Sequence, residues 1–494
     1  MTFGSLSHPR LHHLWQGGGL VFILSASLGM ADCGQSSPLS ESSLAQQAYV
    51  KASNTGADDQ FGSAVALDGD TLVVGTTRED SAAPGINGNQ SDNSGNEVGA
   101  VYVFVRSGGI WSQQAYLKAS NPDDLDTFGT SVAISGNTIV VGAQGEDSNA
   151  TGVNTGNQLD DSVAQAGAAY VFVRSGTTWT QQAYLKSSTA GFNNFGNSVA
   201  IDGDTIAIGA EGEDSVSTGI NGSEVGTGAP SSGAVYIFTR SGATWSQQAY
   251  IKSSNSQSGD QFGHSVALSS NTLAVGANGE DSAATGIGGN QGDNSASAGG
   301  AVYVFTRSGS TWSQQAYVKA SNTASGAGFG HSVSLDGNTL AAGAANANTT
   351  YVFTRSAGIW TQEALLQGAN TENGDQFGIS VALYGDTLAV GASGEDSAAT
   401  GINGDGANNS ASDSGALYVF TRSGTTWTQR DYVKASNADV GVGPITGDYF
   451  GSAVAVNSGT IVSGAIGEDS NATGVGGSQT DNSAADSGAV YVFQ

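Results

Sequence analysis

The segment FGHSVALSSNTLAVGANGEDS, residues 262–282, decides the fold of this chain of 494 residues. Two short apolar runs, SVAL and TLAVGA, are separated by a tight polar turn and followed by an acidic loop. After a stretch rich in Gly, Asn and Asp, the segment GGAVYVFTRSGSTWSQQAYVKASN, residues 299–322, adds two more runs that contain β-branched and aromatic residues. Runs of this kind between turn residues are typical of β-strands, so the unit predicts four antiparallel strands.

This unit occurs seven times along the chain. Its Phe-Gly pair begins at Phe61, Phe128, Phe195, Phe262, Phe329, Phe377 and Phe450. Seven units of four strands predict an all-β fold, a seven-bladed β-propeller of four-stranded antiparallel blades. The composition agrees, because 74 glycines and a charged fraction of only 12% are typical of a protein rich in turns and strands.

The two ends of the repeat region complement each other. The region begins with a fourth-strand segment, QQAYVKAS at residues 46–53, and ends with a third-strand segment, AVYVFQ at residues 489–494. The last unit therefore lacks a fourth strand, and the first segment supplies one. This arrangement predicts a ring closed by strand donation from the N-terminus, with the propeller spanning residues 46–494 after a short linker at residues 34–45.

The segments FGxSVAL, TLxVGA and GAVYVF resemble FG-GAP repeats, the units of the integrin α-subunit propeller and of many bacterial surface proteins. The resemblance covers everything after about residue 45 and implies a propeller that binds a partner at a cell surface. In the integrin pattern, calcium lies in an Asp-rich loop between the first and second strands. Here that connection is a short turn such as Asp68-Gly69-Asp70, so the integrin calcium site is not carried over.

Residues 1–33 have the pattern of an export signal. Arg10 precedes an apolar run from Leu20 to Met30, which is too short to span a bilayer. Cys33, the single cysteine, follows this run as in a bacterial lipoprotein signal, where the cysteine becomes lipidated; Asp32 departs from that pattern. The alternative is ordinary cleavage after Ala31. Both interpretations place the protein in the cell envelope or outside the cell, with membrane contact only through a lipid anchor.

The loop between the second and third strands carries the main site hypothesis. It begins with GEDS or a close variant in six units and runs for about 24 residues, where hairpin loops usually have 2–5. A second acidic or amide residue follows at a nearly constant spacing, and oxygen ligands at both ends of a loop predict Ca²⁺ binding. The candidate ligands are Glu79, Asp80, Asp92, Glu146, Asp147, Asp160, Glu280, Asp281, Asp293, Glu395, Asp396, Glu468, Asp469 and Asp481.

The alternative is that these residues form turns and caps, and that recent duplication of the units has kept the spacing. Two units depart from the pattern: the third keeps Glu213 and Asp214 without the second acidic segment, and the fifth has only AANANTT at residues 344–350. A melt in EDTA and in millimolar Ca²⁺ separates the two interpretations, because an ion that binds only the folded state raises Tm.

Successive connections in such a blade alternate between the two ends of the ring. The GEDS loops therefore share one face with the Asp-rich loops between blades. The opposite face takes the Arg-Ser-Gly turns that begin at Arg106, Arg174, Arg240, Arg307, Arg355 and Arg422. A formal net charge of −28 argues against nucleic acid or an anionic membrane as partner.

We therefore expect an exported, monomeric binding or adhesion propeller that engages a protein or a glycan through its acidic loop face. The alternatives are a propeller-type carbohydrate-active enzyme, which would need a unique carboxylate cluster in the central channel, and a purely structural envelope protein. His264 and His331 occupy a repeat position that other units fill with Ser, Thr, Asn or Ile, so they do not indicate a catalytic site. The Trp and Lys residues of the fourth strands are equally periodic and indicate blade packing or solvated positions.

Overall fold

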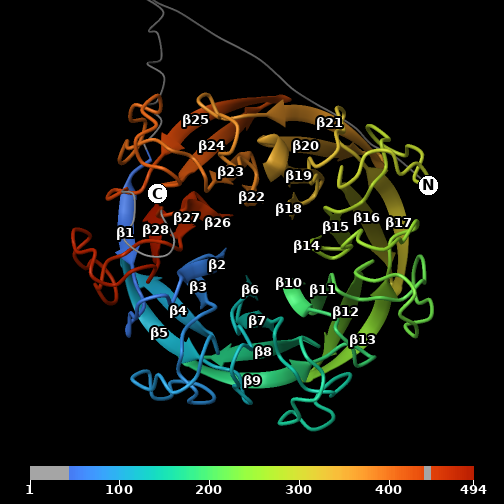
Figure 1. Ribbon diagram of the computed structural model, residues 1–494, viewed down its shortest axis with the longest axis horizontal. Coiled ribbons are helices and arrows are strands. Elements are labelled where there is room, and N and C mark those ends of the chain that lie inside the picture. Colours follow the sequence, from blue (N-terminus) through green and yellow to red (C-terminus); the bar gives the residue numbers. More distant parts are fainter. Residues whose placement is uncertain (1–43, 439–446) are drawn as a thin grey trace, which may run out of the picture. The chain divides into compact units, whose positions relative to one another are not determined.

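Seven four-stranded antiparallel sheets form a ring of blades in the computed structural model, which describes residues 44–438 and 447–494 (Figure 1). The predicted seven-bladed propeller is confirmed. The predicted export signal, including Cys33, lies outside the described residues. No helix within the described ranges is long and apolar enough to cross a membrane.

Each blade uses four strands that follow one another in sequence, with the first strand innermost and the fourth outermost (Figure 1). Blades one to three contain β2 (Phe61–Asp68), β3 (Thr71–Thr76), β4 (Ala100–Ser107), β5 (Ile110–Leu117); β6 (Ser131–Ser135), β7 (Thr138–Ala143), β8 (Ala168–Ser175), β9 (Thr178–Leu185); and β10 (Phe195–Asp202), β11 (Thr205–Ala210), β12 (Ala234–Ser241), β13 (Thr244–Ile251). Blades four and five contain β14 (Ser265–Ser269), β15 (Thr272–Ala277), β16 (Ala301–Ser308), β17 (Thr311–Val318); and β18 (Ser332–Asp336), β19 (Thr339–Ala344), β20 (Thr349–Ser356), β21 (Ile359–Leu366), with the 3-10 turn η1 (Ala345–Ala347). Blades six and seven contain β22 (Val381–Tyr384), β23 (Thr387–Ala392), β24 (Ala416–Ser423), β25 (Thr426–Val433); and β26 (Phe450–Asn457), β27 (Thr460–Ala465), β28 (Ala489–Phe493), β1 (Gln46–Val50).

Blade seven closes the ring with the strand from the start of the described chain. β1 pairs with β28 in antiparallel register, with Tyr49 opposite Tyr491 and Val50 opposite Val490. The predicted strand donation is therefore confirmed. The outermost strand of this blade comes from residues more than 400 positions away in sequence.

The hydrophobic cores lie between blades. Almost every residue of the second strands is buried, as in TLVVGT of β3 and TIVVGA of β7, because a blade covers each face of the sheet. Each of the seven apolar clusters contains side chains from two neighbouring blades. In the first, Phe61 packs edge-on against Tyr102 of its own blade, with ring centroids 5.4 Å apart.

Two glycines explain why the Phe-Gly pair and the glycine near the end of the second strand recur. Gly62 has φ of 99°, a conformation that other residues rarely adopt, and a Cβ there would lie 2.7 Å from the carbonyl oxygen of Ala489 in blade seven. A Cβ on Gly75 would collide with the carbonyl oxygen of Gly129, the Phe-Gly glycine of the next blade. The backbones of neighbouring blades therefore touch directly at these positions.

The face opposite the GEDS loops carries the arginines, as predicted. Each of these arginines lies over the tryptophan of its own blade, as Arg106 does over Trp111 with 5.2 Å between the guanidinium carbon and the ring centroid. Arg174 also donates to Thr71 of the preceding blade at 3.2 Å, and Trp179 Nε1 donates to Gln114 at 2.8 Å. The tryptophans are at most 8% exposed, so they serve blade packing.

Removing β1 should destabilise the whole ring. A chain that begins at Ala52 would leave β28 as an open edge and Glu468 without Lys51, so we expect Tm to fall by about 5–10 °C relative to a chain that begins at Leu44. Calorimetry and size-exclusion chromatography measure this. Equal melting temperatures for the two chains would contradict closure by β1.

Candidate ligand site in the loop face

The glutamate of each GEDS segment forms a buried ion pair with a lysine from the outermost strand region of the same blade. The six pairs have N···O distances of 2.5–2.9 Å and side chains at most 3% exposed: Lys118–Glu79, Lys186–Glu146, Lys252–Glu213, Lys319–Glu280, Lys434–Glu395 and Lys51–Glu468. Burial lowers the pKa of each lysine, and the neighbouring glutamate acts in the opposite direction. These lysines are structural, and they balance the glutamate charge.

The aspartate of the same segment holds the far end of the loop. The Oδ1 atom of Asp80 accepts a hydrogen bond of 2.9 Å from the backbone N–H of Glu97, a residue with φ of 51°. The same bond, at 2.7–2.9 Å, recurs for Asp147, Asp214, Asp281, Asp396 and Asp469. The acidic pair thus fixes both ends of the loop, the glutamate by an ion pair and the aspartate by a backbone cap.

The second acidic segment forms local turns. Asp92, Asp160, Asp293 and Asp481 each accept a bond of 2.9–3.1 Å from the backbone N–H two residues later. Within the described residues, no group of three or more His, Cys, Asp or Glu side chains is placed to hold a metal ion. The glutamates already face an ammonium group, so they do not offer Ca²⁺ a free carboxylate. Calcium binding by the predicted carboxylates of these loops stays a prediction.

Blade five lacks both halves of the ion pair. Its loop is reduced to η1, and Gln367 occupies the lysine position, seven residues after the strand-four tryptophan Trp360. Leu365 occupies the position that holds a tyrosine in the other blades. Loss of the glutamate thus accompanies loss of the lysine, as expected because either charge alone would be buried without a partner.

An asparagine from the preceding inter-blade linker completes the network in five blades. Asn54 donates from Nδ2 to Glu79 and to the carbonyl oxygen of Gln90, both at 3.0 Å, and accepts from the Tyr102 hydroxyl at 2.5 Å. The same three bonds are made by Asn121, Asn255, Asn370 and Asn437. One side-chain amide therefore joins the linker, the glutamate, the loop backbone and a third-strand tyrosine.

Blade three lacks this asparagine. Thr189 takes its place, three residues after Lys186, and the linker from Lys186 to Phe195 is one residue shorter than the linker from Lys118 to Phe128. The Tyr236 hydroxyl is fully buried and has no hydrogen-bond partner of ordinary geometry within the described residues. Burial raises the pKa of Tyr236 well above its usual value, with Thr189 acting in the opposite direction.

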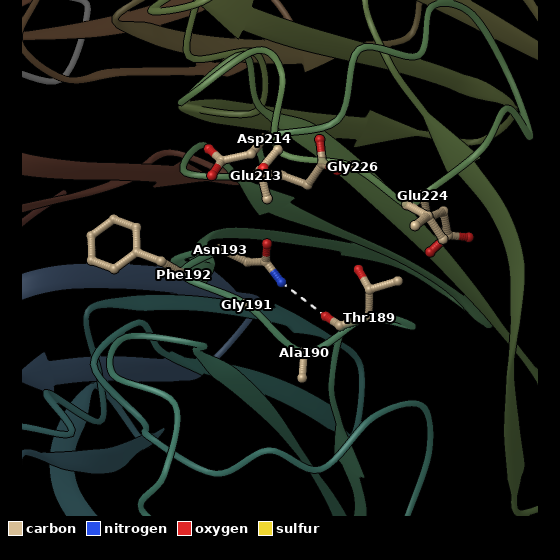
Figure 2. Close-up of a pocket in the computed structure, with 11 residues that line it drawn as sticks. Thr189, Ala190, Gly191, Phe192, Asn193, Glu213, Asp214, Glu224 and Gly226 are labelled. Carbon is tan, nitrogen blue, oxygen red and sulfur yellow. Dashed lines mark hydrogen bonds between the residues drawn. The ribbon is translucent and has the colours of Figure 1, made fainter.

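A cavity of about 320 Å³ opens at this position, and we call it the blade-three pocket (Figure 2). Its lining residues are Thr189, Ala190, Gly191, Phe192, Asn193, Glu213, Asp214, Glu224, Val225, Gly226 and Thr227. The linker forms one side and the GEDS loop the other. Phe192 and Val225 at the rim are 52% and 79% exposed, so the pocket has an acidic interior and an apolar edge.

Glu224 gives the pocket an incompletely paired carboxylate. Its Oε1 atom accepts a long bond of 3.4 Å from Gln247, and its Oε2 atom is buried without a partner in the described structure. Burial, followed by the neighbouring charge of Glu213, raises the pKa of Glu224, and Gln247 opposes this. A ligand that donates hydrogen bonds would relieve this arrangement.

The central channel has a different character. At the end of the channel on the arginine side, aspartates at the ends of first strands cap the turn of the next blade. Asp68 accepts a hydrogen bond of 2.6 Å from the N–H of Gly136, and Asp336 accepts one of 2.7 Å from the N–H of Gly385. The channel carboxylates of the described residues are therefore spread around the ring, unlike the concentrated cluster that the enzyme alternative requires. His264 and His331 lie together, with ring centroids 4.8 Å apart, and His264 Nδ1 is 2.6 Å from Glu211. This contact was not predicted from sequence, because both histidines occupy an ordinary repeat position.

The FG-GAP repeat model matches residues 44–104, 111–172, 179–238, 245–305, 312–353 and 360–420. The chain therefore belongs to the FG-GAP repeat family. None of the curated proteins matches it. Among solved structures, the chain is similar to a candidate 6-phosphogluconolactonase from Bacteroides uniformis, at 11% identity and a TM-score of 0.44, with 76% of this chain and 85% of that chain covered. A likeness at this level carries no argument about activity.

A one-sided change to a buried ion pair should cost far more than a change to both partners. Lys319→Gln leaves Glu280 buried without its counter-ion, and we expect a loss of about 3–5 kcal/mol in the free energy of unfolding. The double variant Glu280→Gln/Lys319→Gln should recover most of this loss, since blade five folds with neither charge. Denaturant unfolding measures both.

The partly exposed pair Arg78–Glu97, at 3.6 Å, is the control, and Arg78→Gln should cost at most about 1 kcal/mol. Additive losses for Glu280→Gln and Lys319→Gln would contradict a coupled pair.

Buried aspartates in the linkers predict a pH dependence of stability. Burial raises the pKa of Asp59 and Asp260 to about 7 and that of Asp126 to about 8, while backbone N–H donors act in the opposite direction. These groups bind a proton in the folded state at pH values where the unfolded chain has lost it. The free energy of unfolding should therefore fall as pH rises from about 4 to about 8 and then level off.

Asp126→Asn should flatten this dependence, because an amide oxygen still accepts the bond of 2.9 Å from the Asp123 N–H and carries no charge. Asn193 already occupies the corresponding position in blade three. Melts at pH 5 and pH 8 test this, and Asp92→Asn, in an exposed turn, is the control. An unchanged slope in Asp126→Asn would assign the dependence to other groups.

Proposed function

We propose that the protein is an exported binding propeller that engages a protein or glycan partner through its acidic loop face, with the blade-three pocket as the point of recognition. The observation that carries this proposal is the departure of blade three from the repeat. It keeps the long loop and the buried ion pair, yet the asparagine that fills this position in all six other blades is missing.

The surroundings of the blade-three pocket support a binding role. Pockets of roughly 300–1,000 Å³ with a few convergent polar groups are the usual form of small-ligand sites, and this pocket lies at the lower end of that range. Phe192 at the rim offers an aromatic face to a sugar or a side chain. The predicted export signal supports a location in the cell envelope or outside the cell, and labelling of intact cells with a membrane-impermeant reagent tests this.

Binding through the blade-three pocket should depend on its own residues. We expect the labelled chain from Leu44 onward to bind members of a peptide or glycan array, and Phe192→Ala and Glu224→Ala to weaken that binding at least about tenfold, or by about 1.4 kcal/mol. Gln291→Ala changes the position in blade four that corresponds to Glu224 and should bind as the unaltered chain does. Equal losses in Gln291→Ala would show that binding does not depend on the blade-three pocket in particular.

A further inference from the structure

We infer that the blade-three pocket recognises a primary carboxamide, the side-chain amide of an Asn or Gln residue presented by a partner polypeptide. This inference rests on the proposed function and specifies the chemical group that the pocket accepts. Its template is the protein itself, since all six other blades have an asparagine at the same position, and in five of them its amide also donates to the loop glutamate.

The template specifies the hydrogen bonds. In blade one, the Asn54 amide gives one N–H to Glu79 and the other to the carbonyl oxygen of Gln90, and its oxygen accepts from Tyr102. Glu213 and Tyr236 are the blade-three counterparts of the carboxylate and the hydroxyl. Glu224 follows Glu213 by the same interval as Gln90 follows Glu79, so we expect its backbone to supply the corresponding carbonyl. The acceptors and the donor for an amide remain, and only the amide is absent.

An acidic cluster alone would not support this inference, but the Tyr236 hydroxyl is an independent observation. It is fully buried, has no partner of ordinary geometry in the described residues, and lies beside Thr189, which lines the pocket. In each of the five template blades, the equivalent hydroxyl donates to an asparagine oxygen at 2.5–2.9 Å. Burial of a donor without its acceptor is costly, so an entering amide oxygen gains this bond.

The number of N–H groups favours a primary amide. The template asparagines use both hydrogens of the amide nitrogen. A secondary amide, such as the acetamido group of an amino sugar, has one N–H and could satisfy only one of the two acceptors. A carboxylate has none, and it would face Glu213, Asp214 and Glu224 with a like charge. A side-chain amide on a peptide also brings a backbone that can contact Phe192 (Figure 2) and the exposed Val225.

Titration calorimetry with N-acetyl-asparagine methylamide and its glutamine homologue tests the inference on the chain from Leu44 onward. We expect one site with a dissociation constant on the order of 1 mM, a value usual for a ligand of this size. N-acetyl-aspartate methylamide and N-acetylglucosamine should bind at least about tenfold more weakly. Absence of binding at 10 mM probe, or equal binding of the aspartate analogue, would overturn the inference, and preference for N-acetylglucosamine would reassign the pocket to a glycan.

Two reciprocal substitutions control for the position. Thr189→Asn supplies the missing amide from within, so it should raise Tm by about 1–3 °C and abolish probe binding. Asn255→Thr opens the same position in blade four and should lower Tm and add a second site for the probe. Probe binding that survives Thr189→Asn would place the site elsewhere. Array binding that depends on Phe192 while the amide probes fail would leave the proposed function standing and reject only the carboxamide.

Discussion

The buried lysine–glutamate pair is the interaction on which the loop face depends. A buried ion pair adds little net stability, because the cost of removing both charges from water offsets their attraction. Its effect here is to fix positions. Lys118 sets where Glu79 lies, Glu79 accepts from Asn54, and Asn54 in turn orients Tyr102. A long loop, an inter-blade linker and two strands are thus aligned around one carboxylate.

Blade five shows that the charged part of this network is lost as a unit. The loop, the lysine and the strand-four tyrosine are all absent, while Asn322 still accepts from Tyr351 at 2.6 Å. The polar groups that remain are those whose hydrogen bonds can be made without a charged partner. Blade three is the opposite case, because it keeps the charges and lacks the amide that would satisfy their neighbours. In a repeat protein, a departure of this second kind leaves unused hydrogen-bonding capacity at one place in the ring.

The fold could be predicted from sequence because its determinants are local and repeated: alternating apolar runs, tight turns, and glycines at fixed places. Strand donation followed from the two incomplete ends. The role of Glu79 could not be derived in the same way, since Lys118 lies on another segment and its periodicity indicated only blade packing or a solvated position. The useful signal was that GEDS and the lysine are missing from the same unit. The pocket could not be predicted because it depends on Thr189 and Glu224, which become neighbours only after the loop folds back. The only signal in the sequence is the change from KASN to KSST in the linker of blade three.

The glycine contacts between blades also determine the geometry of closure. A ring of seven blades closes only if each interface turns the chain by one seventh of a full rotation, and an error at one interface must be absorbed by the others. The contact of Gly75 with Gly129 is repeated around the ring, including Gly343 against Gly378 beside blade five. A hard contact between two backbones leaves little freedom in the spacing, so each interface contributes nearly the same angle. The symmetry of the ring is therefore set near its axis, and the loops at its rim are free to diverge.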